Sequence, residues 1–215
     1  MPRHDKSTPI TRTNDPARTM SDIIAVATQE FADKGLSGAR IDEIAALTQT
    51  SKRMIYYYYG SKEGLYLAVL EDSYARTRSA ESGLHLDDVE PVEALKKLVS
   101  FSIDYKLAHP EFVRLVMTEN IHSAEYLKRS KTAVHMNTPA IDLLQRIYER
   151  GVASGDFRSG IEAFDLHMAI SALSLYNVSN RPTVEAIFKR DITDKKEVDR
   201  MRKNCIDMLL RFVRK

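Results

Sequence analysis

The spacing of apolar residues predicts helices along the chain. The first helix should begin at Asp15-Pro16, an N-cap followed by a proline in the first turn, and end at Gly35. Its apolar residues recur every three or four positions: Met20, Ile23, Ile24, Ala27 and Phe31. This spacing places them on one face, against which the next helices can pack.

Two shorter helices are predicted between residues 40 and 62. Ile41, Ile44 and Ala45 form one apolar stripe, which Thr48-Gln49-Thr50-Ser51 interrupts. Thr50 or Ser51 can cap a second helix, because short hydroxyl side chains accept hydrogen bonds from backbone N–H groups. On that helix Ile55 and Tyr59 face the first helix, and the opposite face carries Lys52, Arg53, Tyr56 and Tyr57. Two short helices joined by a tight turn are what a helix-turn-helix requires.

The outward face of the second helix has the chemistry of a DNA reader. Arg and Lys donate to guanine edges in the major groove, and Tyr can contact phosphates, sugars or thymine methyl groups. From Lys52 to Lys62 there are three cations and no acid. Lys62 falls in the first turn of the following helix, where a cation opposes the helix dipole, so a phosphate partner would explain it.

The segment from Ile41 to Tyr66, IDEIAALTQTSKRMIYYYYGSKEGLY, resembles the DNA-binding signature of the tetracycline-repressor (TetR) family of transcriptional regulators. The matching features are Ile44-Ala45, Ser51, the aromatic run from Tyr56, and Ser61-Lys62-Glu63 followed by Leu65. The resemblance is close over about the first third of the chain and extends to the rest by length and helical layout. Together with the residue chemistry it assigns these candidates for DNA contact: Arg40, Ser51, Lys52, Arg53, Met54, Tyr56, Tyr57 and Lys62.

Composition and charge agree with one DNA-reading segment. The chain has 215 residues, 43% of them apolar, and a net charge of +2. Residues 1–62 hold nine Lys and Arg against seven Asp and Glu, and the remaining 23 bases and 23 acids cancel. All the positive excess therefore lies in the segment that contains the helix-turn-helix, as expected of a reader joined to a neutral second domain.

The expected fold is all-α, with about nine helices. We expect a flexible N-terminal arm at 1–14, a three-helix helix-turn-helix domain at 15–62, and a helical effector-binding and dimerisation domain at 63–215. A long helix from Ser61 to about Ser82, with Gly83 as its stop, should connect the two domains.

Two late helices carry more apolar surface than one subunit needs. Residues 164–178 have one charged residue and apolar groups on every side, which predicts a helix buried all round. The last helix repeats apolar residues at intervals of three and four. We therefore expect these helices to form a homodimer interface, as the resemblance also implies, with these candidates: Met168, Leu175, Val198, Met201, Cys205, Met208 and Phe212.

The second domain shows polar groups among apolar helices, as a small-molecule site requires. The resemblance implies an effector pocket in this region. The candidate residues are Phe101, Tyr105, Met117, Asn120, His122, Tyr148, His167, Tyr176 and Asn177. Satisfied core polarity is an equally good explanation for each of them.

The sequence contains no phosphate loop, zinc-protease motif or nucleophile elbow, so we expect no catalytic residue, no metal site and no cofactor. Its single cysteine excludes an intrachain disulfide. No apolar run is long enough for a bilayer and the N-terminus lacks a signal peptide, so a cytoplasmic location is expected.

The favoured function is thus a homodimeric, effector-released repressor of an inverted-repeat operator. Two alternatives remain open: a helical protein-interaction adaptor without DNA binding, and an enzyme built on helices.

Overall fold

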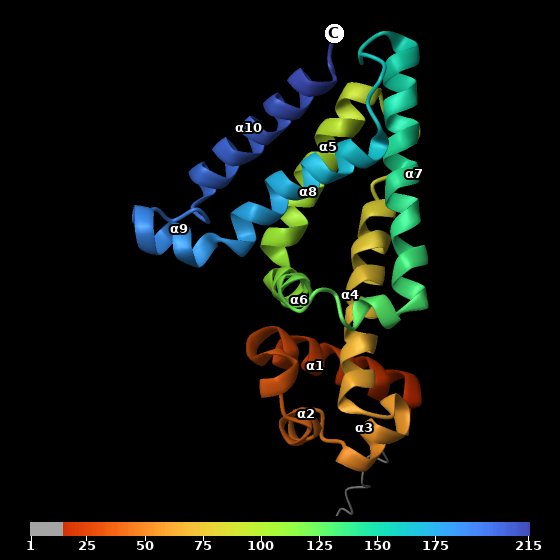
Figure 1. Cartoon of the computed structure of the whole chain (residues 1–215), viewed down its shortest axis with the longest axis vertical. Helices are drawn as coiled ribbons and strands as arrows, with labels where there is room; N and C mark the ends of the chain where they lie inside the picture. The colour runs from red at the N-terminus through yellow and green to blue at the C-terminus, as the bar shows by residue number, and fades with distance from the viewer. Residues whose placement is uncertain (1–14) are drawn as a thin grey trace, which may run out of the picture.

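The structure, a computed structural model, describes residues 15–215 apart from the side chains of Ala133, Val134, Met136 and Asn137. The arm expected at 1–14 lies outside the described residues. Within the described part the chain is all-α, as predicted (Figure 1). The α-helices are α1 Pro16–Gly38, α2 Ile41–Leu47, α3 Lys52–Tyr59, α4 Lys62–Ser82, α5 Pro91–Ala108, α6 Pro110–Ile121, α7 Lys131–Ser154, α8 Ala163–Ser179, α9 Arg181–Phe188 and α10 Lys195–Val213, with a 3-10 turn η1 at Leu127–Arg129.

These ten α-helices of residues 15–215 are one more than the sequence pattern predicts, and the unexpected one is α9. It spans only eight residues, has no side-chain N-cap and has no buried residue. A short helix without a cap or an inward stripe leaves little signal in the sequence.

α1 begins where the sequence predicts and ends three residues later. The Asp15 side chain accepts hydrogen bonds from the backbone N–H groups of Ala17 and Arg18. At Gly35 the backbone turns to φ 66°, so the helix kinks there and one further turn runs to Gly38. The kink brings the chain round to α2.

The first core joins α1, α2, α3 and the first half of α4. Ile23 and Phe31 of α1, Ile44 of α2, Ile55 of α3 and Leu65 of α4 are all fully buried in it. We call this group of helices the N-terminal unit. The predicted apolar stripes therefore pack against one another as expected.

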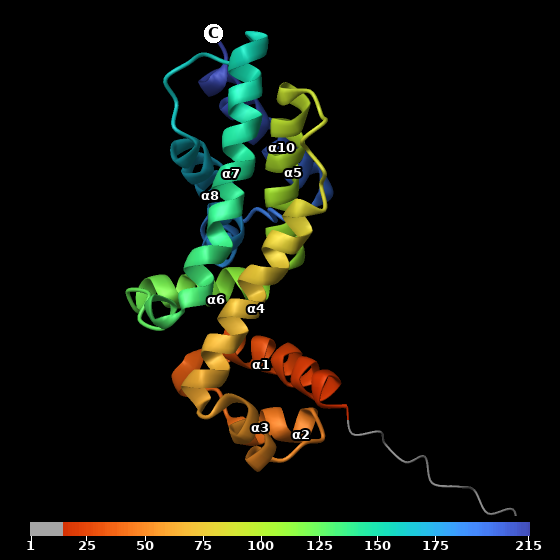
Figure 2. The same ribbon diagram turned by 90° about the vertical axis from the view of Figure 1, so that its right-hand side faces the viewer.

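α4 is the single continuous helix predicted to join the two parts of the chain. It runs from Lys62, beside α3, to Ser82 (Figure 2). Its first half belongs to the first core, and its second half packs along α7 in the upper part of the molecule. The domain boundary predicted at residue 62 falls between α3 and α4 in the sequence. In space, however, α4 contributes to both parts of the molecule that it joins.

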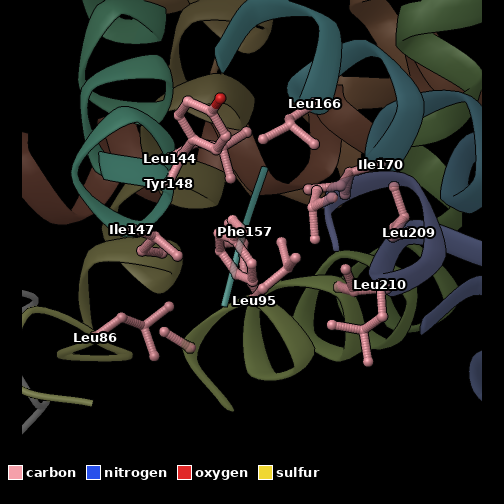
Figure 3. Packing of buried hydrophobic residues seen from close by; sticks show 14 of the residues in the cluster. Leu86, Leu95, Leu144, Ile147, Tyr148, Phe157, Leu166, Ile170, Leu209 and Leu210 are labelled. Carbon is pink, nitrogen blue, oxygen red and sulfur yellow. The ribbon is translucent and has the colours of Figure 1, made fainter. Parts of the chain in front are cut away.

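The C-terminal unit, α5–α10 with the second half of α4, has a core of its own. Phe157, from the loop after α7, lies amid side chains from the surrounding helices (Figure 3). A Cβ atom on Gly151 would lie 2.0 Å from the Phe157 ring, so this position of α7 requires glycine. Tyr148 closes the same region: its hydroxyl donates to the Arg158 carbonyl at 3.0 Å and accepts from the Ile161 N–H at 2.9 Å.

α6 is the second link between the two units. Its Leu115 is fully buried in the first core. Its Glu119 accepts a buried hydrogen bond from the Tyr66 hydroxyl of α4 at 3.1 Å. Arg114 of α6 forms an ion pair with Asp33 of α1. In residues 15–215, no helix has both the length and the apolar character needed to cross a membrane.

Candidate nucleic-acid interface

α3 starts at a capped, tight turn. The Ser51 hydroxyl accepts a hydrogen bond from the Met54 N–H at 3.2 Å, which satisfies one of the free donors at the helix start. Before it, Thr48 ends α2 by donating its hydroxyl to the Ile44 carbonyl at 2.7 Å. The side chain of Ser51 thus has a capping role.

The turn from α3 to α4 is equally constrained. Gly60 adopts φ 76°, a conformation that side chains rarely permit. A Cβ atom on Gly64 would lie 2.1 Å from the Tyr59 carbonyl oxygen. The orientation of α3 relative to α4 therefore depends on the absence of a side chain at Gly64.

α3 has one buried face and one exposed face, as the sequence predicts. Ile55 is fully buried, and the Tyr59 hydroxyl donates to the Met20 carbonyl of α1 at 3.1 Å. On the opposite face Tyr57 is 77% exposed and Tyr56 is 44% exposed. Arg53 is also exposed, so the outer face of α3 offers one cation and two phenol groups to a partner.

The two cations at the start of α3 differ in their partners. The Lys52 ammonium lies 2.5 Å from the Asp42 carboxylate of α2, and this hydrogen bond holds the pKa of Asp42 below its usual value. The Arg53 guanidinium has no hydrogen bond or ion pair with any residue in 15–215. An unpaired guanidinium at the head of a reading helix is available to a guanine edge or a phosphate.

The remaining basic candidates lie at the edges of this surface. The Arg40 backbone N–H donates to Glu30 of α1 at 3.0 Å, while its exposed guanidinium lies 3.8 Å from Asp42 and 3.9 Å from Glu43. The half-buried Lys62 donates to the Ser37 carbonyl at 3.2 Å. This contact with the end of α1 gives Lys62 a local partner that the sequence did not reveal. Met54, the last candidate, is half-buried.

The surface is thus a short, capped helix whose outer face is basic and aromatic and whose inner face is held by α1, α2 and α4. Comparison with known proteins identifies the protein family that has this arrangement. Residues 23–69 match the family model described as bacterial regulatory proteins, tetR family, and residues 91–209 match the tetracyclin repressor-like C-terminal domain. The chain belongs to the TetR family of transcriptional regulators. Proteins of this family bind operator DNA, form dimers and respond to small-molecule effectors.

Relatives in the TetR family extend the likeness over most of the chain. It is 39% identical to the HTH-type transcriptional repressor NicS of Pseudomonas putida over 178 residues, which cover 83% of this chain and 84% of NicS. It is 27% identical to the HTH-type transcriptional regulator RutR of Escherichia coli over 80% of this chain and 79% of RutR. This TetR-family chain is therefore a DNA-binding transcriptional regulator, and it is not an enzyme.

Solved TetR-family structures share the fold. A regulator from Rhodococcus RHA1 superposes with a TM-score of 0.71 at 20% identity, covering 91% of this chain and 97% of that one. A regulator from Mesorhizobium loti gives a TM-score of 0.70 at 18% identity, covering 94% and 100%.

The nine effector candidates do not converge on one place. Phe101 and Tyr105 pack ring against ring on α5, with centroids 5.4 Å apart. His167 of α8 is half-buried and lies 3.5 Å from the Ser171 hydroxyl of its own helix. Met117 lines a separate cavity of about 620 Å³ between α6, α8 and α9. Tyr148 lies in the core, where both its donor and its acceptor are used.

The other four candidates lie towards the surface or bond locally. Asn120 and Asn177 donate to carbonyl groups one turn earlier on their own helices, at 2.8 and 2.6 Å. His122 and Tyr176 are exposed.

Sequence reasoning missed three residues of the interior: Arg78, Glu81 and Lys106. A signal was present, because the inward stripe of α4 turns polar in its second half, where Ser73, Thr77 and Glu81 are buried. On α5, Lys106 follows the buried Ser102 by one turn at the end of an otherwise apolar stripe. Polar residues at core positions are informative, because burying them without partners is unfavourable.

The predicted dimer residues fall into three groups. Met168, Met208 and Phe212 are 51%, 48% and 41% exposed on α8 and α10. Leu175, Val198 and Met201 are half-buried. Cys205 is different, because it is only 3% exposed and belongs to the core of its own subunit.

α8, expected to be covered on one side by its own domain and on the other by a second subunit, has an exposed face in the single subunit. Phe164 and Tyr176 are 57% and 60% exposed on it.

Proposed function

We propose that this regulator is a homodimeric repressor that places the α3 helices of its two subunits in successive major grooves of an inverted-repeat operator. Arg53 grips a base edge, and Tyr56 and Tyr57 contact sugars, phosphates or thymine methyl groups. Lys52, which is held by Asp42, supplies a positioned positive charge to the backbone. The unpaired Arg53 on the exposed face of α3 is the observation that carries this assignment.

The supporting residues position α3 on the duplex. Ser51 presents the helix start, where free N–H groups and the helix dipole favour a phosphate. Met54 packs beside the groove, and Arg40 and Lys62 reach phosphates at either edge. Lys62 exchanges its contact with the Ser37 carbonyl for the phosphate, which is a stronger, charge-assisted partner.

The second subunit is held through α8 and α10. Exposed apolar side chains follow one face of α8 at helical spacing, from Phe164 and Met168 to Tyr176, and α10 adds Met208 and Phe212. α10 forms the edge of the C-terminal unit opposite α7 (Figure 1). Two copies of this face form a four-helix bundle about a two-fold axis, which buries surface that would otherwise stay in contact with water.

The effector acts from inside the C-terminal unit. α4 and α6 both line or border that interior and both pack on α1 or α3. A ligand that fits one arrangement of α4 and α6 better shifts the population towards it. When that arrangement separates the two α3 helices wrongly for the operator, the protein leaves the DNA.

Selection from a library of random duplexes tests the proposal. We expect enrichment of an inverted repeat, salt-sensitive binding to the selected duplex, and two subunits per site. The matched variants are Arg53→Ala on the reading face and Arg76→Ala, an exposed arginine on the far half of α4. Loss of binding in Arg53→Ala alone supports the assignment. Failure to enrich any sequence at low salt would contradict DNA reading and favour a protein-interaction adaptor.

A further inference from the structure

The cavity that Met117 lines lies where α6 of the C-terminal unit meets α1 of the N-terminal unit. Its volume is about 620 Å³, and its wall is formed by residues of α1, α5, α6, α8 and α9. α6 supplies the largest share, including Val113 and Met117, while α1 supplies Ala32 and α8 supplies Val178. Small-molecule sites usually have volumes of about 300–1,000 Å³. The cavity is therefore large enough for an organic effector, and it reaches the N-terminal unit directly.

Most of the cavity wall is apolar, and part of it is open to water. Ile121, at the end of α6, is 74% exposed although it lines the cavity. Met117 and Val178 are half-buried. A ligand with an apolar body would remove this surface from water, which is favourable. The exposed position of Ile121 also gives such a ligand a route into the cavity from solvent.

α9 borders the cavity with its inner face. Arg181 and Glu185, one turn apart on this helix, both line the cavity. α9 has no buried residue and no side-chain N-cap, so little tertiary packing supports it. A molecule between α9 and α6 would bury part of α9 for the first time. The ligand would thus hold α9, α6 and α1 in one arrangement.

The charged groups at the cavity are already paired. Arg114 of α6 forms an ion pair with Asp33 of α1. The Arg181 Nε atom lies 2.7 Å from the Glu185 carboxylate. Neither guanidinium has a further hydrogen bond or ion pair with residues 15–215, so each retains N–H donors that can serve a ligand. A charged ligand would find its own charge repeated nearby, because an anion would meet the two carboxylates and a cation the two guanidinium groups.

An uncharged ligand with an acceptor oxygen matches this chemistry. A carbonyl oxygen can accept from a spare guanidinium N–H group and leave both ion pairs intact. Arg181 is the better placed donor. Its carboxylate partner Glu185 lines the cavity with it, whereas the partner of Arg114 belongs to α1 and does not line the cavity.

We propose that this cavity binds the effector, and that the effector is an uncharged molecule with an apolar body and a carbonyl oxygen that accepts from Arg181. The inference rests on the proposed effector response, and it gives the place and the chemical class of the ligand. Because Ala32 belongs to the wall, the bound molecule acts on α1. α1 is bonded to the reading helix through the Tyr59 hydroxyl and the Met20 carbonyl, so the signal reaches α3 through α1 as well as through α4.

The test uses the full-length protein and compounds that share a body and differ in their polar group. One set is 2-acetylnaphthalene, 2-naphthoate and 2-naphthylmethylamine, and the other is 2-nonanone, octanoate and octylamine. Thermal unfolding is followed at pH 7 and matched ionic strength. At least one ketone should raise the melting temperature more than the acid and the amine of the same body. The same ketone should lower the affinity for the selected operator duplex.

Two variants with matched controls locate the site. Ile121→Lys should weaken binding of the ketone about threefold or more, because it removes apolar surface from the wall. Ile187→Lys should not, since Ile187 is similarly exposed, at 70%, but does not line the cavity. Arg181→Met should weaken the ketone about tenfold, because it removes a hydrogen bond from a charged donor. Arg190→Met is its control, because Arg190 is an exposed arginine that pairs with Glu197 outside the cavity.

Each variant is compared with its own melting temperature without ligand, so a change in stability is not mistaken for a change in binding. Equal effects of ketone, acid and amine, or no effect of either ketone, would overturn the inference. An unchanged response in Ile121→Lys or in Arg181→Met would also overturn it, as would ketone binding that leaves operator affinity unaltered. Operator binding without compounds is measured in parallel. If it persists in any of these cases, the proposed repressor function stands and only the effector site is wrong.

Discussion

The hydroxyl of Tyr66 donates a buried hydrogen bond of 3.1 Å to the carboxylate of Glu119, and it joins the start of α4 to α6 across the junction of the two units. The second carboxylate oxygen of Glu119 accepts from the Leu127 N–H at 2.9 Å. Burial, and then the negative charge of Glu119, raise the pKa of Tyr66. α4 leads to the reading helix α3, and α6 leads to the interior of the C-terminal unit. The bond therefore lies where that interior and the reading helix must be coupled.

Removing the hydroxyl should therefore affect both stability and coupling. Tyr66→Phe leaves one buried oxygen of Glu119 without its donor, which should lower the free energy of unfolding by about 1–3 kcal/mol in urea titrations. The matched control is Tyr58→Phe, because the half-buried Tyr58 has no hydroxyl hydrogen bond within residues 15–215. Equal stability losses in the two variants would show that the bond to Glu119 contributes nothing.

Arg53 should carry sequence discrimination. Arg53→Ala is expected to relax preference at one position in each half-site, at a cost of about 1–3 kcal/mol against the preferred base. Repeating the duplex selection with the variant measures this. If the selected sequence is unchanged, Arg53 contacts the DNA backbone or makes no contact with the DNA.

Lys62 should behave as a phosphate contact. Lys62→Ala is expected to weaken binding to all sequences alike and to lower the slope of log affinity against log salt by about 0.9 per subunit. Titrations at several salt concentrations measure the slope. The bond to the Ser37 carbonyl is the competing explanation. A loss of unfolding free energy with an unaltered salt slope would assign Lys62 to the α1–α4 contact instead.

Gly64 should be required for the orientation of α3. A methyl group there would lie 2.1 Å from the Tyr59 carbonyl oxygen, so Gly64→Ala must displace α3 from α4. We expect a loss of about 1–3 kcal/mol in stability and a larger proportional loss of operator affinity. Gly83→Ala is the control, because a methyl group at that end of α4 meets its neighbours at 3.4 Å or more. Normal operator affinity in Gly64→Ala would contradict the orientation argument.

Lys106 should make stability depend on pH in a known direction. Its pKa is about 8 in the folded protein and 10.5 in the reference state, so the unfolded chain binds more protons between these values. The folded state therefore gains stability as the pH rises from about 8 towards 10.5, by up to about 3 kcal/mol. The groups facing Lys106 are Arg78 and Glu81 of α4 and His167 of α8.

The difference between Lys106→Met and wild type isolates this effect. Urea unfolding at pH 7 and pH 9.5 should show an advantage of the variant that is large at pH 7 and smaller at pH 9.5. An advantage that stays constant or grows with pH would contradict a charged, desolvated Lys106.

The sequence predicted well those features that depend on residues close together along the chain. The Asp15 cap, the two faces of α3 and the continuity of α4 depend on residues within a few positions of one another. Their spacing alone determines which side of a helix is apolar. The family signature adds to these local patterns and agrees with them.

What the sequence did not predict depends on which helices meet. The contact of Lys62 with Ser37 joins residues 25 positions apart. The influence of the Arg78 and Lys106 charges on the pKa of His167 depends on the packing of three helices, which no period in the sequence specifies. For the same reason Cys205, which fits the apolar repeat of α10, turned out to face its own core.

The size of the DNA-bound complex on the selected duplex shows whether the protein reads its operator as a dimer. We expect two subunits bound to an inverted repeat whose half-sites lie about 34–36 Å apart, with affinity that falls steeply as salt rises. Exposed side chains on α8 and α10, such as Met168 and Phe212, should become protected from solvent in that complex. A single subunit on a single half-site, or binding without sequence preference, would contradict it.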